Sequence, residues 1–311
     1  MERPNPEFGY CLDDNARALI VAVRAQPLTG ESGLFDYVRH YLAFVERCQR
    51  ADGRFHNFMA SDGTWLDEVG SEDSQGRAIW ALGFAARHSP QTEVRLRALQ
   101  CLDRALKPLD ELTFLRGRAF TLLGLEHWRA AEPAPELDAL TKQLASGLAA
   151  AYERSAAPEW RWFEDELTYC NARLPQALLG TRWAGMALES LAWLCGILEV
   201  DGRISLIGNR GWYRRGAERA VYDQQAVDAA AAVSACAAAY GTSGDDRFHR
   251  WAKLGYAWFH GQNPGDRSML DPETGGCYDG LEPDGVNLNQ GAESLLAWLL
   301  AWEDMAEMGW L

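Results

Sequence analysis

A short polar signature recurs at the start of helical segments, and this repeat limits the possible folds more than any other feature of the chain. Its six occurrences are Asp14-Asn15-Ala16-Arg17-Ala18, Ser74-Gln75-Gly76-Arg77-Ala78, Arg116-Gly117-Arg118-Ala119, Asn171-Ala172-Arg173, Gln225-Ala226-Val227-Asp228-Ala229 and Asn289-Gln290-Gly291-Ala292-Glu293. Their spacing runs from 41 residues (Arg77 to Arg118) to 65 residues (Asp228 to Glu293). This distance holds two helices and two loops, so the repeat predicts helical hairpins.

Apolar residues recur at helical spacing along most of the chain, whereas the alternation typical of strands is scarce. Ten amphipathic segments are expected as helices: Asp13–Gln26, Phe35–Gln49, Gln75–Arg87, Glu93–Leu106, Gly117–Arg129, Glu136–Glu153, Trp183–Leu198, Gln225–Tyr240, Arg247–His260 and Gln290–Met305. Another segment begins at Asn171 but is interrupted by Pro175, which suits only the first turn of a helix. The sequence therefore predicts an all-α protein.

Helices that carry the signature differ in composition from those between them. They are small and apolar, most clearly at 226–239, while 35–49 and 136–153 carry charges on one face. This alternation of inner and outer helices predicts a single (α/α)6 barrel or toroid over residues 1–311; a two-domain helical solenoid is the alternative. Only five outer helices accompany six inner ones, so the toroid is expected to lack one outer helix, unless upstream sequence or a second copy of the chain covers the gap.

Charge and composition exclude several classes of partner. With 30 Lys and Arg against 44 Asp and Glu, the net charge is −14, which opposes binding to nucleic acid. No apolar run is long enough to span a membrane. The seven cysteines form no CxxC element, which favours a reducing, cytoplasmic location. The acidic charge also favours a neutral substrate over a polymer of uronic acids.

The loops before the predicted inner helices are rich in acids, amides and aromatic residues, which is the chemistry of a sugar-binding cleft. Ring faces stack on sugars, and two carboxyl groups can act as acid and base on a glycosidic bond. The candidate catalytic residues are Asp14, Asp73, Glu166, Asp228 and Glu293, with Asp13, Glu72 and Asp165 as supporting or capping groups. The candidate substrate-binding residues are Tyr10, Asn15, Arg17, Trp65, Asp67, Gln75, Arg77, Trp160, Trp162, Asn171, Arg173, Trp212, Gln225, Tyr278, Asp279, Asn289 and Gln290. Helix capping by the short polar residues, core packing of the tryptophans and buried ion pairs of the arginines are the structural alternatives.

Four strings carry a resemblance to a known group of proteins. They are Gly9-Tyr10-Cys11-Leu12-Asp13-Asp14-Asn15-Ala16-Arg17-Ala18-Leu19, Glu72-Asp73-Ser74-Gln75-Gly76-Arg77-Ala78, Gly275-Gly276-Cys277-Tyr278-Asp279-Gly280-Leu281 and Asn287-Leu288-Asn289-Gln290-Gly291-Ala292-Glu293-Ser294. Together they resemble bacterial six-hairpin, glycosidase-like proteins that are often associated with glycosyltransferases. The resemblance implies an (α/α)6 carbohydrate-active domain.

The function expected first is a glycoside hydrolase that cleaves a neutral oligosaccharide by carboxylate acid–base catalysis with inversion, without a cofactor or metal. A sugar epimerase is the first alternative; it needs a histidine for proton transfer, for which His56 and His260 are candidates. A carbohydrate-binding or scaffold module is the second, and a phosphorylase the third. A zinc site that uses Cys195 or Cys277 with His260 matches no compact ligand motif.

Overall fold

The computed structural model describes residues 5–31 and 33–311, and within them it contains eleven α-helices and nine very short strands. The chain divides into two compact units, Met1–Gly147 and Leu148–Leu311, with the boundary inside α6 (Pro135–Ser155). The predicted organisation as a single toroid domain stays a prediction.

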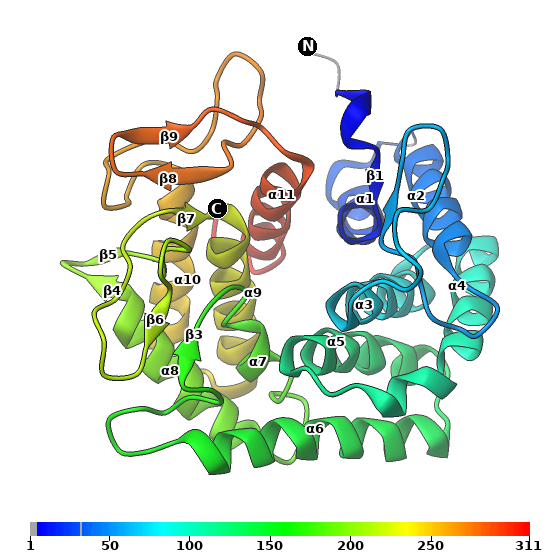
Figure 1. Ribbon diagram of the computed structural model, residues 1–311, viewed down its shortest axis with the longest axis horizontal. Helices are drawn as coiled ribbons and strands as arrows, with labels where there is room; N and C mark the ends of the chain where they lie inside the picture. The colour runs from blue at the N-terminus through cyan, green and yellow to red at the C-terminus, as the bar shows by residue number, and fades with distance from the viewer. Residues whose placement is uncertain (1–4, 32) are drawn as a thin grey trace. The chain divides into compact units, whose positions relative to one another are not determined.

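The first unit consists of two kinds of helix (Figure 1). Three are buried over much of their surface, namely α1 (Leu12–Thr29), α3 (Glu72–His88) and α5 (Leu115–Ala131). The helices α2 (Leu34–Cys48) and α4 (Thr92–Ala105) bury a single apolar stripe against them, as their amphipathic patterns predict. Two 3-10 helices, η1 (Pro6–Phe8) and η2 (Lys107–Glu111), and the paired strands β1 (Tyr10–Cys11) and β2 (Phe58–Met59) complete the unit.

The second unit is organised around α9 (Ala226–Ser243), an alanine-rich helix that is buried on nearly all sides. Its neighbours are α7 (Arg173–Gln176), α8 (Ala184–Leu198), α10 (Asp246–Phe259) and α11 (Ala292–Glu307). Short strands link these helices: β3 (Glu166–Leu167) pairs with β6 (Tyr213–Arg214), and β4 (Glu199–Val200) with β5 (Arg203–Ile204). The strands β7 (Gln224–Gln225), β8 (Gly280–Glu282) and β9 (Gly285–Asn287) form a three-stranded sheet.

All ten amphipathic segments expected from the sequence are helices, with ends that differ by a few residues. The segment after Asn171 is shorter than its pattern indicates. It forms only the four-residue helix α7, in which Pro175 is the third residue. Because proline has no N–H and its ring clashes with the preceding turn, it suits the start of a helix and not its interior. No helix in the described part of the chain is long and apolar enough to span a membrane.

Two histidines meet where α3 and α5 end. The Nε2 atom of His88 lies 3.2 Å from Nδ1 of His127, and the ring of Phe84 contacts both imidazoles. Burial lowers the pKa of His127 from 6.5 to about 3, and the positive charges that His88, Arg87 and Arg24 can carry lower it further. His127 is therefore neutral in the folded protein over most of the acidic range.

Acid is expected to destabilise the protein through His127. Between pH 6.5 and about 3, the unfolded chain binds a proton at His127 that the folded chain does not. The free energy of unfolding should then fall by about 1.4 kcal/mol for each unit that the pH drops in this range. Urea unfolding at several pH values tests this. His127→Gln should flatten the pH dependence, whereas His40→Gln, at an exposed position of α2, should not; equal slopes in all three proteins would contradict the assignment.

Candidate functional site

In the first unit, a loop is fastened across the N-terminal ends of α1 and α3. The main-chain oxygen of Asn57 accepts a hydrogen bond from the N–H of Leu12 at 2.8 Å, which is where α1 begins. The side chain of Gln75 in α3 accepts from the N–H of Phe55 and donates to its oxygen, both at 2.9 Å. Since both polar ends of Gln75 are occupied by the main chain and its side chain is buried, we assign it a structural role and not the predicted substrate contact.

His56 in this loop is held in one tautomer. Its Nδ1 lies 2.9 Å from the main-chain oxygen of Asp67, and a carbonyl oxygen can only accept a hydrogen bond. In the neutral ring Nδ1 therefore carries the proton and Nε2 carries the lone pair. The imidazole stacks on Trp65, with ring centroids 4.4 Å apart and an interplanar angle of 10°. Within the described residues, Nε2 has no hydrogen-bond partner, so it is available as a base.

Asp67 fixes the backbone directly after this histidine. Its carboxylate accepts hydrogen bonds from the N–H of Asn57 at 2.7 Å and of Phe58 at 3.3 Å. One carboxylate oxygen also lies 3.8 Å from His56 Nδ1, and the side chains of His56 and Asp67 are 15% and 19% exposed. Asp67, predicted to bind substrate, thus holds the loop and orients the imidazole.

Two buried arginines lie in the second turns of α1 and α3. Arg17 donates to Asp14 at 2.8 Å, and Arg77 lies 3.8 Å from Asp13. The Arg77 guanidinium also stands over the ring of Phe120, with 4.0 Å between its central carbon and the ring centroid. Arg17 and Arg77 are 3% and 6% exposed. The structure thus places cations and carboxylates together at this end of the unit, as the polar signature predicts.

The other acids at this end have unequal roles. Glu72 accepts hydrogen bonds from the N–H groups of Thr113 and Phe114 at 2.7 and 2.8 Å, so it caps the start of α5. Asp73 is half-buried in the first turn of α3. Asn15 donates to the main-chain oxygen of Cys11 at 2.8 Å. The capping role considered for Glu72 is confirmed, while the catalytic roles of Asp14 and Asp73 stay predictions.

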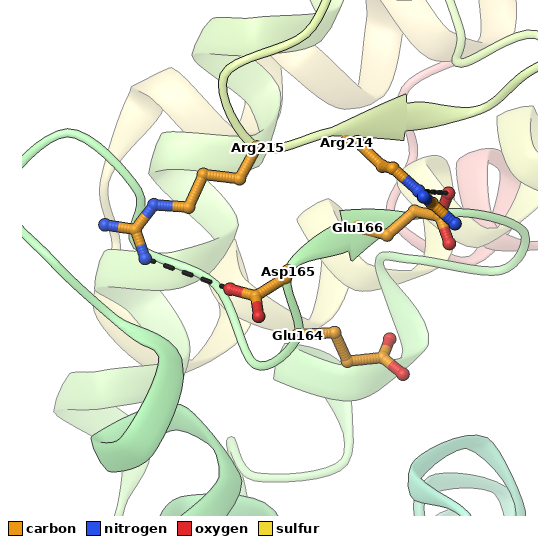
Figure 2. Close-up of a pocket in the computed structure, with 5 residues that line it drawn as sticks. All are labelled: Glu164, Asp165, Glu166, Arg214 and Arg215. Carbon is orange, nitrogen blue, oxygen red and sulfur yellow. Dashed lines mark hydrogen bonds and ion pairs between the residues drawn. The ribbon is translucent and has the colours of Figure 1, made fainter.

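In the second unit, β3 and β6 form the wall of a pocket of about 590 Å³ (Figure 2). The described residues that line it all have charged side chains: Glu164, Asp165, Glu166, Arg214 and Arg215. Figure 2 shows Asp165 and Glu166 turned toward different arginines. Glu166 was predicted from the sequence as a catalytic acid, whereas the two arginines were missed. The strands β3 and β6 have two residues each, which is too short to show the alternation of a strand. Their pairing could therefore not be predicted from the sequence.

Four described residues of the second unit have a backbone conformation that non-glycine residues rarely adopt: Cys170, Asp201, Trp212 and Asp266. Cys170 has φ 49° and Trp212 has φ 54°. The N–H of Cys170 donates to Asp228 at 2.5 Å, and Asp228 is 7% exposed in the first turn of α9. The rings of Trp212 and Tyr169 contact each other, with centroids 6.5 Å apart. Asp228 thus holds the backbone at Cys170, while the catalytic role of Asp228 and the substrate contact of Trp212 stay predictions.

The N-terminus of α11 is capped by a side chain from a distant loop. Asp279 accepts hydrogen bonds from the N–H of Gly291 at 2.7 Å, from Ser294 Oγ at 2.8 Å and from Asn289 Nδ2 at 2.5 Å. Gln290 donates to Asp271 at 2.8 Å. The predicted substrate contacts at 279, 289 and 290 thus hold this helix end together. Glu293 is half-buried in the first turn of α11.

The stacking roles expected for Trp160 and Trp162 are wrong, because both rings belong to the core. They are 3% and 0% exposed and pack against Trp193, and Trp160 also contacts Tyr213. Neither has a free ring face for a sugar. Trp65, by contrast, keeps part of its side chain at the surface.

The other residues predicted to bind substrate differ in burial and in their hydrogen-bond partners. Asn171 is buried and bonds with both ends of its amide to the main chain of Thr168, so it shapes the loop. Arg173 is also buried and donates to Gln176 at 2.6 Å. Gln225 pairs within the sheet as part of β7. The substrate contacts predicted for Tyr10 and Tyr278, which are partly exposed, stay predictions.

The thiols considered for a zinc site lie in the core. Cys195 contacts Cys236, with 3.5 Å between the sulfur atoms, and Cys277 is 0% exposed. Burial raises the pKa of Cys277 to about 12, with the negative charge of Asp279 adding to the effect. Over residues 5–31 and 33–311, no group of three or more His, Cys, Asp or Glu side chains is placed to hold a metal ion.

Comparisons with known proteins place this geometry in a fold class. No protein-family model matches the chain, and no curated protein matches it in sequence. Among solved structures, a sugar epimerase from a ruminal bacterium is similar with a TM-score of 0.75 and 16% identity, covering 98% of this chain and 89% of that one. The cellobiose 2-epimerase from Spirochaeta thermophila has a TM-score of 0.72 and 15% identity, with coverage of 98% and 88%. A glycosyl hydrolase of family 88 from Bacteroides vulgatus has 0.65 and 11%, with coverage of 97% and 93%.

These likenesses establish the fold. The chain has the six-hairpin, (α/α)6 toroid fold of glycosidase-like proteins, as its repeat predicts. Both TM-scores for structures of epimerases exceed that for the hydrolase.

Proposed function

We propose that this protein is a carbohydrate-active enzyme that moves a proton at a sugar carbon, as an epimerase or an aldose–ketose isomerase does. The observation that carries this proposal is the histidine tautomer: in the neutral ring of His56 the lone pair is on Nε2, because Nδ1–H donates to the main-chain oxygen of Asp67. The similarity to structures of a sugar epimerase and a cellobiose 2-epimerase supports it.

The chemistry starts from the open-chain form of a reducing sugar. His56 Nε2 removes the proton from the carbon next to the carbonyl group; the electron pair of that C–H bond forms a C=C bond and the π pair of the carbonyl group moves to its oxygen, giving an enediolate. Delivery of a proton from water to the opposite face of the same carbon, with His56 losing its own proton to solvent, gives the epimer. Return of a proton to the former carbonyl carbon gives the ketose. Both routes balance without an oxidant, a reductant or a cofactor.

Buried cations at the same end of the unit suit the charge that develops. The enediolate is anionic, and preorganised cations stabilise such a charge better than water does. Arg77 is held over Phe120 and beside Asp13, in the helix whose Gln75 clamps the residue before His56. We assign Arg77 the stabilising role and Trp65 the role of orienting the imidazole by stacking.

Incubation with reducing sugars in D2O tests the proposed reaction. The panel is glucose, mannose, galactose, fructose and cellobiose, followed by NMR. We expect an epimer or a ketose to form, with deuterium at the carbon next to the carbonyl group, because the proton on His56 exchanges with solvent. New reducing ends with no deuterium at carbon would overturn the proposal in favour of hydrolysis.

A glycoside hydrolase acting on a neutral oligosaccharide with inversion is the second candidate. One observation favours it: Glu166, one of the acids predicted to be catalytic, is 31% exposed at the wall of a pocket in the size range of ligand sites. Hydrolysis by such acids would be lost on changing them to amides, whereas His56→Asn would leave it intact.

A further inference from the structure

The pocket between β3 and β6 has an unusual lining for a ligand site. Such pockets are mostly apolar with a few polar groups, but this one is lined by three carboxylates and two guanidinium groups. Three negative charges against two positive charges leave a net charge of −1. A phosphorylated or carboxylated sugar would therefore be repelled at this place, and a neutral ligand would not.

The two arginines differ in how firmly they are held. Arg215 donates to the main-chain oxygen of Ser155 at 3.1 Å and to Glu159 at 2.9 Å, and its own N–H donates to the oxygen of Asp165 at 2.9 Å. Arg214 makes a single contact within the pocket, from Nε to Glu166 at 3.2 Å, and its side chain is 77% exposed. Exposed ion pairs of this kind contribute little stability, so a ligand can take over the Arg214 contact.

The pattern of donors and acceptors matches vicinal hydroxyl groups. A sugar hydroxyl donates one hydrogen bond and accepts others, and it is satisfied best between an acceptor and a donor. Glu166 directly faces Arg214 across the β3–β6 pair, so a carboxylate and a guanidinium lie side by side on one wall. Hydrogen bonds to charged groups are stronger than those between neutral partners.

We propose that the β3–β6 pocket binds a neutral, hydroxyl-rich sugar unit, with Arg214 and Glu166 as its hydrogen-bonding partners. This goes beyond the proposed function, since the pocket lies in the second unit and His56 in the first: it assigns to the pocket neutral sugars and not sugar phosphates or uronates. Arg215 keeps the wall in place, and Arg214 exchanges part of its contact with Glu166 for the sugar.

Binding is measured by isothermal titration calorimetry at two salt concentrations, so that turnover is not needed. The probes are the neutral sugars glucose, mannose, galactose and cellobiose, with glucose 6-phosphate as the anionic comparison. We expect at least one neutral sugar to bind with little dependence on salt and more tightly than glucose 6-phosphate. Arg214→Ala and Glu166→Gln should each weaken that binding about tenfold.

Arg203→Ala is the matched control, because Arg203 is also an exposed arginine paired with an acid, Asp266, in the second unit but outside the pocket. It should bind sugar like the wild type. Tighter, salt-sensitive binding of glucose 6-phosphate, failure of every neutral sugar to bind, or unchanged binding in both pocket variants would overturn the proposal. Sugar binding without exchange in D2O would instead support this inference while overturning the proposed reaction.

Discussion

Replacing His56 with Asn is expected to lower the rate of sugar epimerisation or isomerisation by about 10²- to 10⁴-fold, the usual contribution of a positioned general base. Asn cannot take up a proton, but its side chain can still donate to the main-chain oxygen of Asp67 that now binds Nδ1. Because the hydrogen bonds from the N–H groups of Asn57 and Phe58 to the Asp67 carboxylate do not involve the His56 side chain, the fold should be retained. Rates of deuterium incorporation and of product formation measure the effect.

The control is His40→Asn, at an exposed position of α2. It should leave the rate unchanged, and both variants should unfold at the same urea concentration as the wild type. A second variant, Trp65→Leu, removes the stacked ring but keeps the base. We expect a smaller loss of rate there, because only the orientation of the imidazole is relaxed. Near-wild-type turnover by His56→Asn would exclude His56 as the base.

The helices could be predicted because their signal is local. Each of the ten periodic segments buries either one apolar stripe or most of its surface. In both cases the spacing of the apolar residues along the sequence predicts a helix. The length of α7 was predicted wrongly for a local reason too. The apolar pattern around Pro175 is helical, but proline cannot lie in a helix interior, so the helix stays short. The strand pairs could not be predicted, because ladders of two or three residues are too short to show alternation.

The candidate site was predictable only where its contacts are close in sequence. Asp14 and Arg17 are three positions apart on one helix, so their ion pair follows from helical geometry. Glu166 and Arg214 are joined only through the pairing of β3 with β6, which no sequence pattern announces. The tautomer of His56 depends on a main-chain oxygen eleven residues away. Every residue has such an oxygen, so the types of the side chains do not predict this contact.

Burial was the other limit on prediction from sequence. Trp65 and Trp160 both occur in loops before predicted inner helices, yet Trp65 covers a histidine at the surface and Trp160 is enclosed by Trp193 and Tyr213. Which of them stays accessible depends on long-range packing. Large half-polar rings suit either place, so composition does not distinguish them.

The second large effect is expected from glycines where α3 and α5 meet. Gly76 and Gly83 lie seven positions apart on α3, as do Gly117 and Gly124 on α5, so each pair marks one face of its helix. A Cβ atom on Gly124 would lie 2.5 Å from the main-chain oxygen of Ile79. The absence of side chains thus lets the two backbones touch, which explains why these residues are glycine in spite of their low helix propensity.

Gly83→Ala should destabilise the protein by about 2 kcal/mol, and Gly83→Val by more. A Cβ atom on Gly83 would be 2.3 Å from the oxygen of Gly124, a main-chain atom that cannot turn away, so the helices must separate. Overpacking of this kind costs about 1–3 kcal/mol or more and outweighs the gain of roughly 1 kcal/mol in helix propensity. Urea unfolding of the variants measures the change.

Gly196→Ala is the control that separates crowding from propensity. Gly196 is an exposed residue of α8, and a Cβ atom there would have nothing within 4 Å. The same substitution should therefore stabilise the protein by up to about 1 kcal/mol, because only the propensity term remains. Opposite signs for the two alanine variants would show that close approach of α3 and α5, and not glycine content as such, sets the stability of this part of the fold. If Gly83→Ala stabilised the protein as much as Gly196→Ala does, the two helices could not be in the close contact described.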